Sequence, residues 1–409
     1  MRSSCVVATN PWHTLVVTAA LVLTSGAGAA GQQAETVPAG RWQTGILSVT
    51  PVVAVRDIGI DTNLFNDAVD PKSDFTFIAS PEAKASLAFP VGSLTFGTQV
   101  DFVYFQTYER ERSVNTDTSL AFEMPINRLR LRSTASYLNA RRRQNSEIDA
   151  RVRGTEADVI VGAAVQVSGL TTFGFETRMA RIGYNTNAVF DGENLPSRLN
   201  RDELRFRTSF RYSVTPLTTL VANGDVERWR FELSPLRDAN SFRIFPGVEF
   251  DASALLSGRA YVGYRSFDSL DPDLPGFKGL VASGDLTYTI REATRLSVIF
   301  DRDLTYSYRR VRPYYLLTSW TGSVRHKLGS GIEVEGRGGL ETLDYSVASP
   351  VGTTFSPPEN VYLYGLRLSY GLGPSSRILF DVVHRNRTSS LEQRNYEALQ
   401  GGVSVTYGF

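Results

Sequence analysis

The feature that most constrains the fold is the regular alternation of short and long connections between segments of period-two patterning. From Gln43 onward, apolar and polar residues alternate along the chain, which is typical of β-strands with one apolar face. Tight turns, such as the one near 90–92, alternate with longer polar loops, such as 185–201 and 346–358. Consecutive antiparallel strands that reverse on opposite sides of one membrane need this arrangement. The sequence therefore predicts an all-β fold, a transmembrane up-and-down antiparallel β-barrel.

The segments between these connections number about eighteen, and sixteen stays open as an alternative if one hairpin is misread. The barrel is expected over residues 43–409, which gives about 21 residues for each strand with its connection, against the roughly 9 to 11 needed to cross a membrane. The least regular stretches are 241–257, where Pro246 and apolar clusters blur the alternation, and 217–233, where the charged positions change phase. One extra residue exchanges the two faces of a strand, so we expect a β-bulge between Glu227 and Trp229.

Both ends of the chain are typical of an exported barrel. Residues 1–29 combine a positive start, a short apolar core and a small-residue cleavage site, which indicates a secretory signal peptide. Residues 30–42 would follow as a short periplasmic segment. The chain ends on an alternating strand, which could pair with the first strand and so remove both free edges. We expect the barrel-assembly machinery to recognise this strand through Val403, Val405, Tyr407 and Phe409.

Composition argues against several other classes of protein. The 409 residues carry a net charge of +1, which gives no reason to expect nucleic acid as a partner. The mean hydropathy of −0.15 is the balance expected when one face of each strand meets lipid and the other meets water. The single cysteine, Cys5, lies in the expected signal peptide, so neither disulfides nor cysteine metal sites are expected. No cofactor motif is present, and we expect a bacterial outer-membrane protein in contact with lipid.

A barrel of about 16 to 18 strands is too wide for its side chains to fill, and it encloses an aqueous lumen unless a plug occupies it. No segment is long enough to form a separate plug domain, so the longest loops could at most fold inward. Passage of a hydrophilic solute is therefore the expected function. Strand parity predicts lumen-lining residues of both charges with an excess of arginine, namely Arg128, Arg130, Arg132, Arg205, Arg207, Arg211, Arg259, Arg265, Arg337, Arg367, Arg377, Arg385, Asp101, Asp301, Glu333, Glu335 and Asp381.

Two interpretations of this arginine excess stay open. Guanidinium groups are permanently charged and make forked contacts with carboxylates and phosphates, so they would favour acidic solutes such as an acidic polysaccharide. Alternatively, rows of arginine and acidic residues pair across neighbouring strands and stiffen the wall. Pairing is the better account of any single arginine, and only the collective excess indicates selectivity.

A short motif follows the first expected strand, at Gly59, Asp61, Asn63 and Phe65. Aspartate and asparagine satisfy local backbone groups and tolerate turn conformations, which suits the exit from a strand. A calcium loop of the EF-hand type would need glycine where Asn66 stands, so no metal site is expected.

This motif, the signal peptide, the all-strand body and the terminal Phe409 together resemble the β-barrel porin type 2 family. Members often belong to exopolysaccharide synthesis and secretion systems, in which an eighteen-strand barrel is thought to pass the polymer through the outer membrane. The resemblance therefore implies exopolysaccharide export, with polysaccharide as the solute and periplasmic polysaccharide-export components as candidate partners.

Catalysis is not expected. Beyond the signal peptide the only histidines are His326 and His384, and neither stands in a pattern that would support a catalytic set. Three non-enzymatic functions stay open: a porin for exopolysaccharide export, a general or oligosaccharide-uptake porin, and a structural or adhesive barrel with a blocked lumen.

Overall fold

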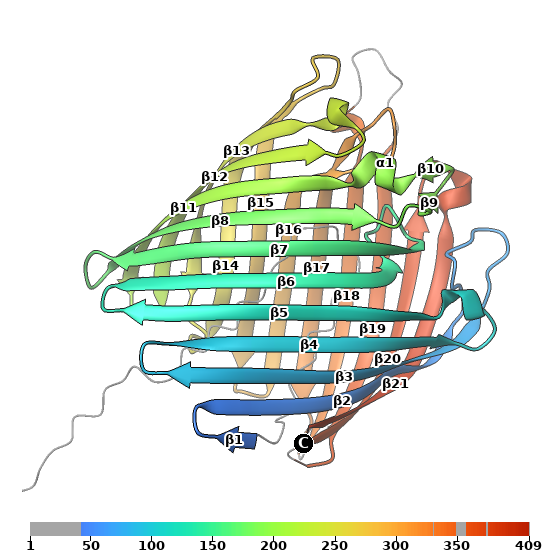
Figure 1. Ribbon diagram of the computed structural model, residues 1–409. Helices are drawn as coiled ribbons and strands as arrows, with labels where there is room; N and C mark the ends of the chain where they lie inside the picture. The colour runs from blue at the N-terminus through green and yellow to red at the C-terminus, as the bar shows by residue number, and fades with distance from the viewer. Residues whose placement is uncertain (1–41, 330, 349–356, 374, 409) are drawn as a thin grey trace, which may run out of the picture.

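The computed structural model describes residues 42–329, 331–348, 357–373 and 375–408 and shows a closed β-barrel (Figure 1). Its 19-stranded sheet contains the short β1 (Trp42–Thr44), which pairs with β2 (Leu47–Asp61), and eighteen long strands that pair in chain order. β2 also pairs with β21 (Tyr396–Gly408), and this ladder closes the wall. The predicted antiparallel barrel of eighteen strands is confirmed. The expected signal peptide lies outside the described residues.

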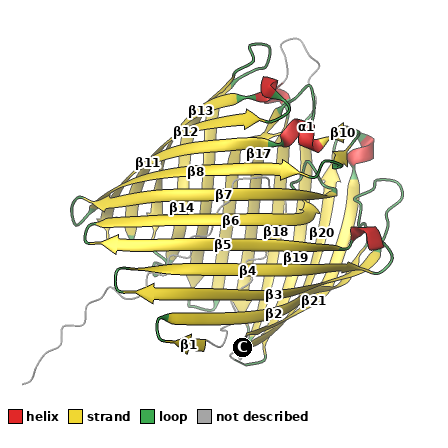
Figure 2. Ribbon diagram, viewed as in Figure 1, coloured by secondary structure: helices red, strands yellow, loops and turns green. Residues whose placement is uncertain are grey.

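Nearly all of the ordered structure is strand, and the short helical elements lie in the long connections (Figure 2). No helix among the described residues is long and apolar enough to cross a membrane. The connection between β8 and β11 holds the hairpin β9–β10 and α1. The remaining elements are β3 (Asp74–Phe89), β4 (Gly92–Phe105), η1 (Glu109–Glu111), β5 (Ser113–Ile126), β6 (Leu129–Arg143), β7 (Arg151–Gln166), β8 (Thr171–Tyr184), β9 (Val189–Phe190), β10 (Glu193–Asn194), α1 (Leu195–Leu199), β11 (Arg201–Thr215), β12 (Thr218–Phe231), η2 (Pro235–Arg237), β13 (Ala239–Phe250), β14 (Leu256–Ser269), β15 (Phe277–Ile290), β16 (Thr294–Tyr306), β17 (Tyr314–Lys327), β18 (Ile332–Asp344), η3 (Ser346–Ala348), β19 (Glu359–Gly371), β20 (Ser376–Thr388) and η4 (Glu392–Arg394).

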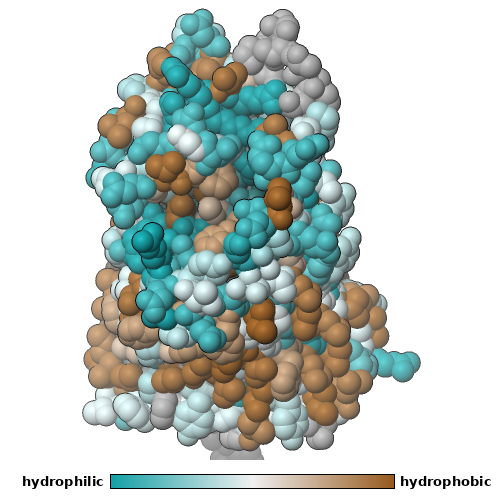
Figure 3. Space-filling model, turned by 90° about the vertical axis from the view of Figure 1, so that its right-hand side faces the viewer, coloured by the Kyte–Doolittle hydropathy of each residue, from teal (hydrophilic) through white to brown (hydrophobic). Residues whose placement is uncertain are grey.

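The outside of the wall is apolar, as expected for a surface that meets lipid. On β11 the outward Phe206 and Phe210 remain 45% and 40% exposed. Seen from the side of α1, the molecule has a hydrophilic upper part, where the long loops gather, and a hydrophobic lower part (Figure 3). This division matches an apolar band in the membrane with polar loops beyond it.

The closing ladder between β2 and β21 depends on small residues. Its register shifts between Val55 and Ile58, where Asp57 adopts a positive φ of 52°. Just beyond this bulge, a Cβ added to Gly59 would collide with the backbone carbonyl of Gly401. The glycine of the sequence motif is therefore needed because β21 approaches β2 too closely there for any side chain.

The prediction of a bulge between Glu227 and Trp229 is wrong. β12 pairs with β11 and with β13 through this segment without a register shift. Glu227 is buried inside the barrel, whereas Arg228 is exposed on the outside. The charged residues move from inward to outward positions because β12 approaches its loop end, where the outer face of the barrel also carries polar residues. A bulge is therefore not needed to explain the change.

The wall is interrupted on one side near the loop end. Pairing between β15 and β16 stops at Ala282↔Arg302, although β16 stays paired with β17 up to Tyr306↔Tyr314. The consecutive residues Tyr314, Tyr315 and Leu316 are all buried, although neighbours on a strand point to opposite faces. The loop end of the β16–β17 hairpin is therefore covered on both faces, because it leans into the barrel.

Candidate functional site: the lumen and its mouth

Charged side chains line the inside of the wall in rows that run from strand to strand. On β11, the partly buried Arg205, Arg207 and Arg211 alternate with the exposed Phe206 and Phe210. Since successive side chains of a strand point to opposite faces, these arginines lie on the lumen side.

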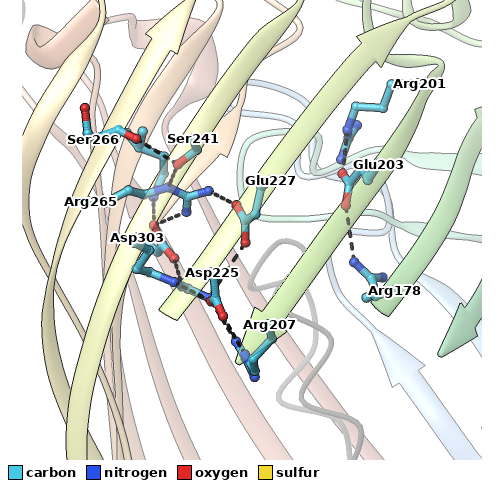
Figure 4. A network of polar contacts seen from close by, with 12 residues as sticks. Arg178, Arg201, Glu203, Arg207, Asp225, Glu227, Ser241, Arg265, Ser266 and Asp303 are labelled. Atoms are coloured by element: carbon cyan, nitrogen blue, oxygen red, sulfur yellow. Dashed lines mark hydrogen bonds and ion pairs between the residues drawn. The ribbon is translucent and has the colours of Figure 1, made fainter. Parts of the chain in front are cut away.

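One row centres on Asp225, which is fully buried on β12 (Figure 4). Its carboxylate accepts hydrogen bonds from Arg207 Nε of β11 at 2.6 Å and from Arg243 Nη2 of β13 at 2.6 Å. Each guanidinium contributes two nitrogens, and those of Arg207 bind the two carboxylate oxygens in the forked geometry that makes such pairs strong. The contact of Arg207 with Asp225 therefore supports the interpretation that arginine and acidic residues pair across neighbouring strands.

A second carboxylate, Asp303, reaches the same row from β16 (Figure 4). Its oxygens lie 2.7 Å from Arg243 Nη1 and 2.5 Å from Arg265 Nη1. Arg265 also pairs with Glu227 of β12. Because β13 and β14 are not neighbours of β16, these contacts form only where the hairpin leans inward.

The strands β17 to β20 carry a further set of pairs. Arg337 Nη2 and Arg367 Nε lie 2.8 Å and 3.1 Å from the two oxygens of Asp381. Glu335 lies 2.7 Å from Arg325, an arginine that the sequence did not single out. Four predicted lining residues are thus brought together here, with their charges balanced.

The other predicted lining residues are distributed along the wall. Asp101 accepts from Arg56 and Ser80 at 2.7 Å each. Arg132 pairs with Glu176, and Arg211 pairs with Glu249. Arg130, Arg259 and Arg385 form no ion pair within 4 Å among the described residues, although Arg259 acts on Glu249 and Asp301 from farther away and Arg385 acts on Glu341. Of the remaining predicted residues, Arg128 lies at the tight turn before β6, Asp301 lies on β16 and Arg377 lies at the start of β20. Glu333 lies on β18, 3.5 Å from Arg325.

Sequence reasoning missed part of the network, although the signal was present. Arg201 and Glu203 share the parity of Arg205, and Glu203 joins Arg201 to Arg178 of β8 (Figure 4). Arg243 was missed because Pro246 and apolar clusters blur the alternation in β13, yet it lies between two outward residues, Phe242 and Ile244.

The connection between β6 and β7 reaches across the loop end of the barrel to another part of the wall. Its Glu147 is fully buried and accepts hydrogen bonds from Ser307 Oγ at 2.5 Å, Tyr345 Oη at 2.8 Å and Tyr308 N at 3.2 Å. These partners follow β16 and β18, on another part of the wall. Burial raises the pKa of the Glu147 carboxyl, and the hydrogen bond from Ser307 opposes this only in part.

Two buried arginines fasten the same loop from β20 and η4. Arg387 donates to Asp149 Oδ2 at 2.8 Å and also contacts Glu359. Arg394 donates to the backbone oxygen of Glu147 at 2.6 Å and to Tyr308 Oη at 2.8 Å. The loop is therefore held by charged and polar contacts at Glu147 and Asp149.

Apolar packing adds to these contacts. Ile148 packs with Leu195 and Leu199 around Tyr308. On the other face of the hairpin, Tyr306 lies edge-on to Phe231 of β12, with ring centroids 4.7 Å apart. The leaning hairpin is thus packed between the β12–β14 wall and the β6–β7 loop.

The motif Gly59, Asp61, Asn63 and Phe65 organises the β2–β3 connection. Asp61 Oδ1 accepts from Asn63 N at 3.0 Å, and Asn63 Nδ2 donates to Glu397 O of β21 at 3.0 Å. The Phe65 ring lies edge-on to Tyr108 at 4.9 Å. Among the described residues, no group of acidic, histidine or cysteine side chains could hold a metal ion.

On β21, Val405 and Tyr407 are 38% and 47% exposed, on the same face as Val403. Phe409 lies outside the described residues. Neither histidine joins the lumen: His384 Nε2 lies 2.7 Å from Glu397 on the outer wall, and His326 contacts Thr294 near a tight turn.

The closed wall and charged interior are those of a porin-like barrel, and the sequence itself fits a known family. The family described as Putative beta-barrel porin 2 matches residues 42–409. The chain belongs to this family. It is a porin-like barrel of the bacterial outer membrane, where its wall contacts lipid. No curated protein sequence matches it.

Solved structures share the fold at low identity. The outer membrane protein opdK from Pseudomonas aeruginosa gives a TM-score of 0.50 at 9% identity, covering 88% of this chain and 98% of that one. A BenF-like porin from Pseudomonas fluorescens Pf-5 gives 0.51 at 9% identity, covering 88% and 98%. The copper transporter OprC gives 0.44 at 11% identity, covering 87% of this chain but 64% of its own length. These similarities concern the fold alone.

Proposed function

We propose that this porin-like barrel is a non-enzymatic channel for a hydrophilic solute and that the packed mouth is its closed state. The observation that carries the proposal is the burial of Glu147 against residues that follow β16 and β18. Side-chain and backbone polar groups dominate this contact, and water can replace such partners once the loop moves. Loops open at a lower free energy than a paired wall, so the mouth could clear while the barrel stays intact.

We further propose that the solute is an exopolysaccharide leaving the cell. The implication of the family resemblance supports this, as do the charged rows that would hydrate a polymer along the wall. The unpaired Arg130, Arg259 and Arg385 could make passing contacts with acidic sugars. The paired arginines are already neutralised, so selectivity would come from these few groups rather than from the whole excess.

Single-channel recording in planar bilayers tests the channel. Arg394→Gln removes donors to Glu147 and Tyr308, so we expect it to raise the open probability well above that of the native protein. Arg110→Gln is the matched control, because Arg110 is an exposed loop arginine whose side chain has no partner in the described chain. If neither the native protein nor Arg394→Gln ever conducts, the barrel is structural and the proposal fails.

Deletion of the gene tests the solute. Loss of surface polysaccharide, with polymer retained in the periplasm, would support export. Normal surface polysaccharide with slower growth on one oligosaccharide would instead show an uptake porin. Co-purification of periplasmic polysaccharide-export components is a further expected result. The folding rate of a variant truncated before Val403, compared with that of the native chain, would test whether assembly depends on recognition of the last strand by the barrel-assembly machinery.

A further inference from the structure

The outer wall of β7, β8, β11 and β12 carries cationic side chains directly above an apolar surface. The strand register aligns these residues in two rows across the four strands. The row nearer the loops is polar except at its first position, and the next row is apolar except at its last position. The upper row is Ala157, Arg181, Asp202 and Arg230, and the lower row is Val159, Met179, Leu204 and Arg228.

These two rows line a hollow of about 530 Å³ on the outside of the barrel. Its floor includes Met179 and Leu204, which are 50% and 40% exposed. Deeper in the wall the outward residues are apolar, as at Phe206 and Val226. The hollow therefore lies where the apolar band meets the polar loop end, at the level of lipid headgroups.

The charges of the hollow are not balanced within it. Arg181 makes a forked pair with Asp202, at 2.7 and 2.9 Å, and both side chains remain largely exposed. Arg228 has no partner among the described side chains. Arg230 is held by the backbone oxygens of Trp229 and Ala239, at 2.8 and 3.0 Å.

Carboxylates outside the hollow act on two of these three guanidinium groups, since Glu232 also attracts Arg181. Asp238 forms an ion pair with Arg230, with its Oδ2 atom 3.8 Å from Arg230 Nε. Glu203, which also borders the hollow, pairs with Arg178 and Arg201 on the lumen side. The hollow thus keeps one guanidinium group, that of Arg228, wholly available to a ligand, beside the exposed Arg181.

We propose that this hollow binds a phosphorylated glycolipid of the outer leaflet. Its phosphate would lie between Arg181 and Arg228, and an acyl chain would lie along Met179 and Leu204. Guanidinium groups make forked hydrogen bonds to phosphate, and each cationic side chain near a membrane surface attracts an anionic lipid by about 1 kcal/mol. The site is independent of the lumen, so it stands whether or not the channel conducts.

The test uses the detergent-solubilised full barrel and lipid A that carries both phosphates. Binding would be measured by native mass spectrometry or by retention of a fluorescent lipid A. The double variant Arg181→Gln/Arg228→Gln should bind about thirtyfold more weakly than the native protein, equivalent to about 2 kcal/mol. Both positions are exposed, and heat-modifiable migration on gels would show that the variant barrel is folded.

The matched control is Lys278→Gln/Arg302→Gln, which removes two cationic groups on β15 and β16 outside the hollow. It should bind lipid A as the native protein does. Equal binding by the two double variants would overturn the site. If the native protein binds phosphatidylglycerol as tightly as lipid A, the assignment to a glycolipid is overturned. Lipid A without its phosphates should bind the native protein weakly, with the same affinity that the Arg181→Gln/Arg228→Gln variant has for intact lipid A.

Discussion

Asp303 of β16 lies 2.7 Å from Arg243 of β13, although two strands separate them in the wall. A cylindrical wall would hold strands three places apart too far from each other for this contact, since neighbouring strands are spaced by about 4.8 Å. The contact exists because the β16–β17 hairpin has left β15 beyond Ala282↔Arg302. The ion pair therefore holds part of the wall inside the lumen.

Asp303→Asn should release this hairpin. Arg243 and Arg265 are both buried, and each would lose its charged partner on β16. Breaking a buried ion pair from one side costs about 3–5 kcal/mol, so the leaning conformation should become much less populated. We expect a clear rise in open probability in single-channel records.

Asp301→Asn is the matched control for this change. Asp301 lies on the same strand and the same face, yet it makes no ion pair among the described residues. It should leave gating as in the native protein. Equal effects of the two variants would mean that inward charge, and not the lean of the hairpin, controls conduction.

Gating should depend on pH through Glu147. Burial raises the pKa of its carboxyl in the closed mouth, while Ser307, Arg394 and Arg309 oppose the shift. In an open mouth the hydrated carboxyl would return to a pKa of about 4.3. The closed state then binds the proton more tightly, so it is most stable below about pH 4 and loses stability as pH rises through the raised pKa. Open probability should therefore increase with pH.

Glu147→Gln should weaken this dependence. Burial also raises the pKa of Asp149, so the variant should keep a shallower slope rather than none. Glu109→Gln, which alters an exposed loop carboxylate, should keep the full slope. A steep profile in Glu147→Gln would assign the proton to another group.

The sequence predicted the wall but not the mouth, for a physical reason. Strand parity and connection length are local properties, so they revealed eighteen strands and the inward placement of residues such as Arg205. The burial of Glu147 depends on residues about 160 to 200 positions away, which no local pattern encodes. The expected bulge near Glu227 failed for a similar reason, because the depth of a residue in the membrane decides whether an outward arginine is tolerated.

The lipid-facing surface should tolerate charge poorly. Phe210→Arg would place a guanidinium on the outward face of β11, three rows below Leu204 and near the middle of the apolar band. Such a change costs about 2–4 kcal/mol at the bilayer midplane. Unfolding by denaturant in lipid vesicles should show this loss. Ser323→Arg, on the lumen face of β17, should change stability by a much smaller amount, and comparable losses would contradict the assignment of the two faces.

Closure of the barrel should depend on Gly59 more than on a typical strand glycine. A Cβ at Gly59 would collide with the carbonyl of Gly401, where β2 meets β21, whereas one at Gly336 of β18 would meet no atom within 4 Å. Gly59→Ala must therefore separate the closing strands locally, which removes ladder hydrogen bonds in a medium that offers no water to replace them. The fraction of folded barrel, measured by heat-modifiable migration on gels, should fall sharply for Gly59→Ala and stay native for Gly336→Ala. If both variants fold equally well, the close approach of β21 to β2 does not limit closure, and the bulge at Asp57 must be what sets the spacing of the two backbones in this ladder.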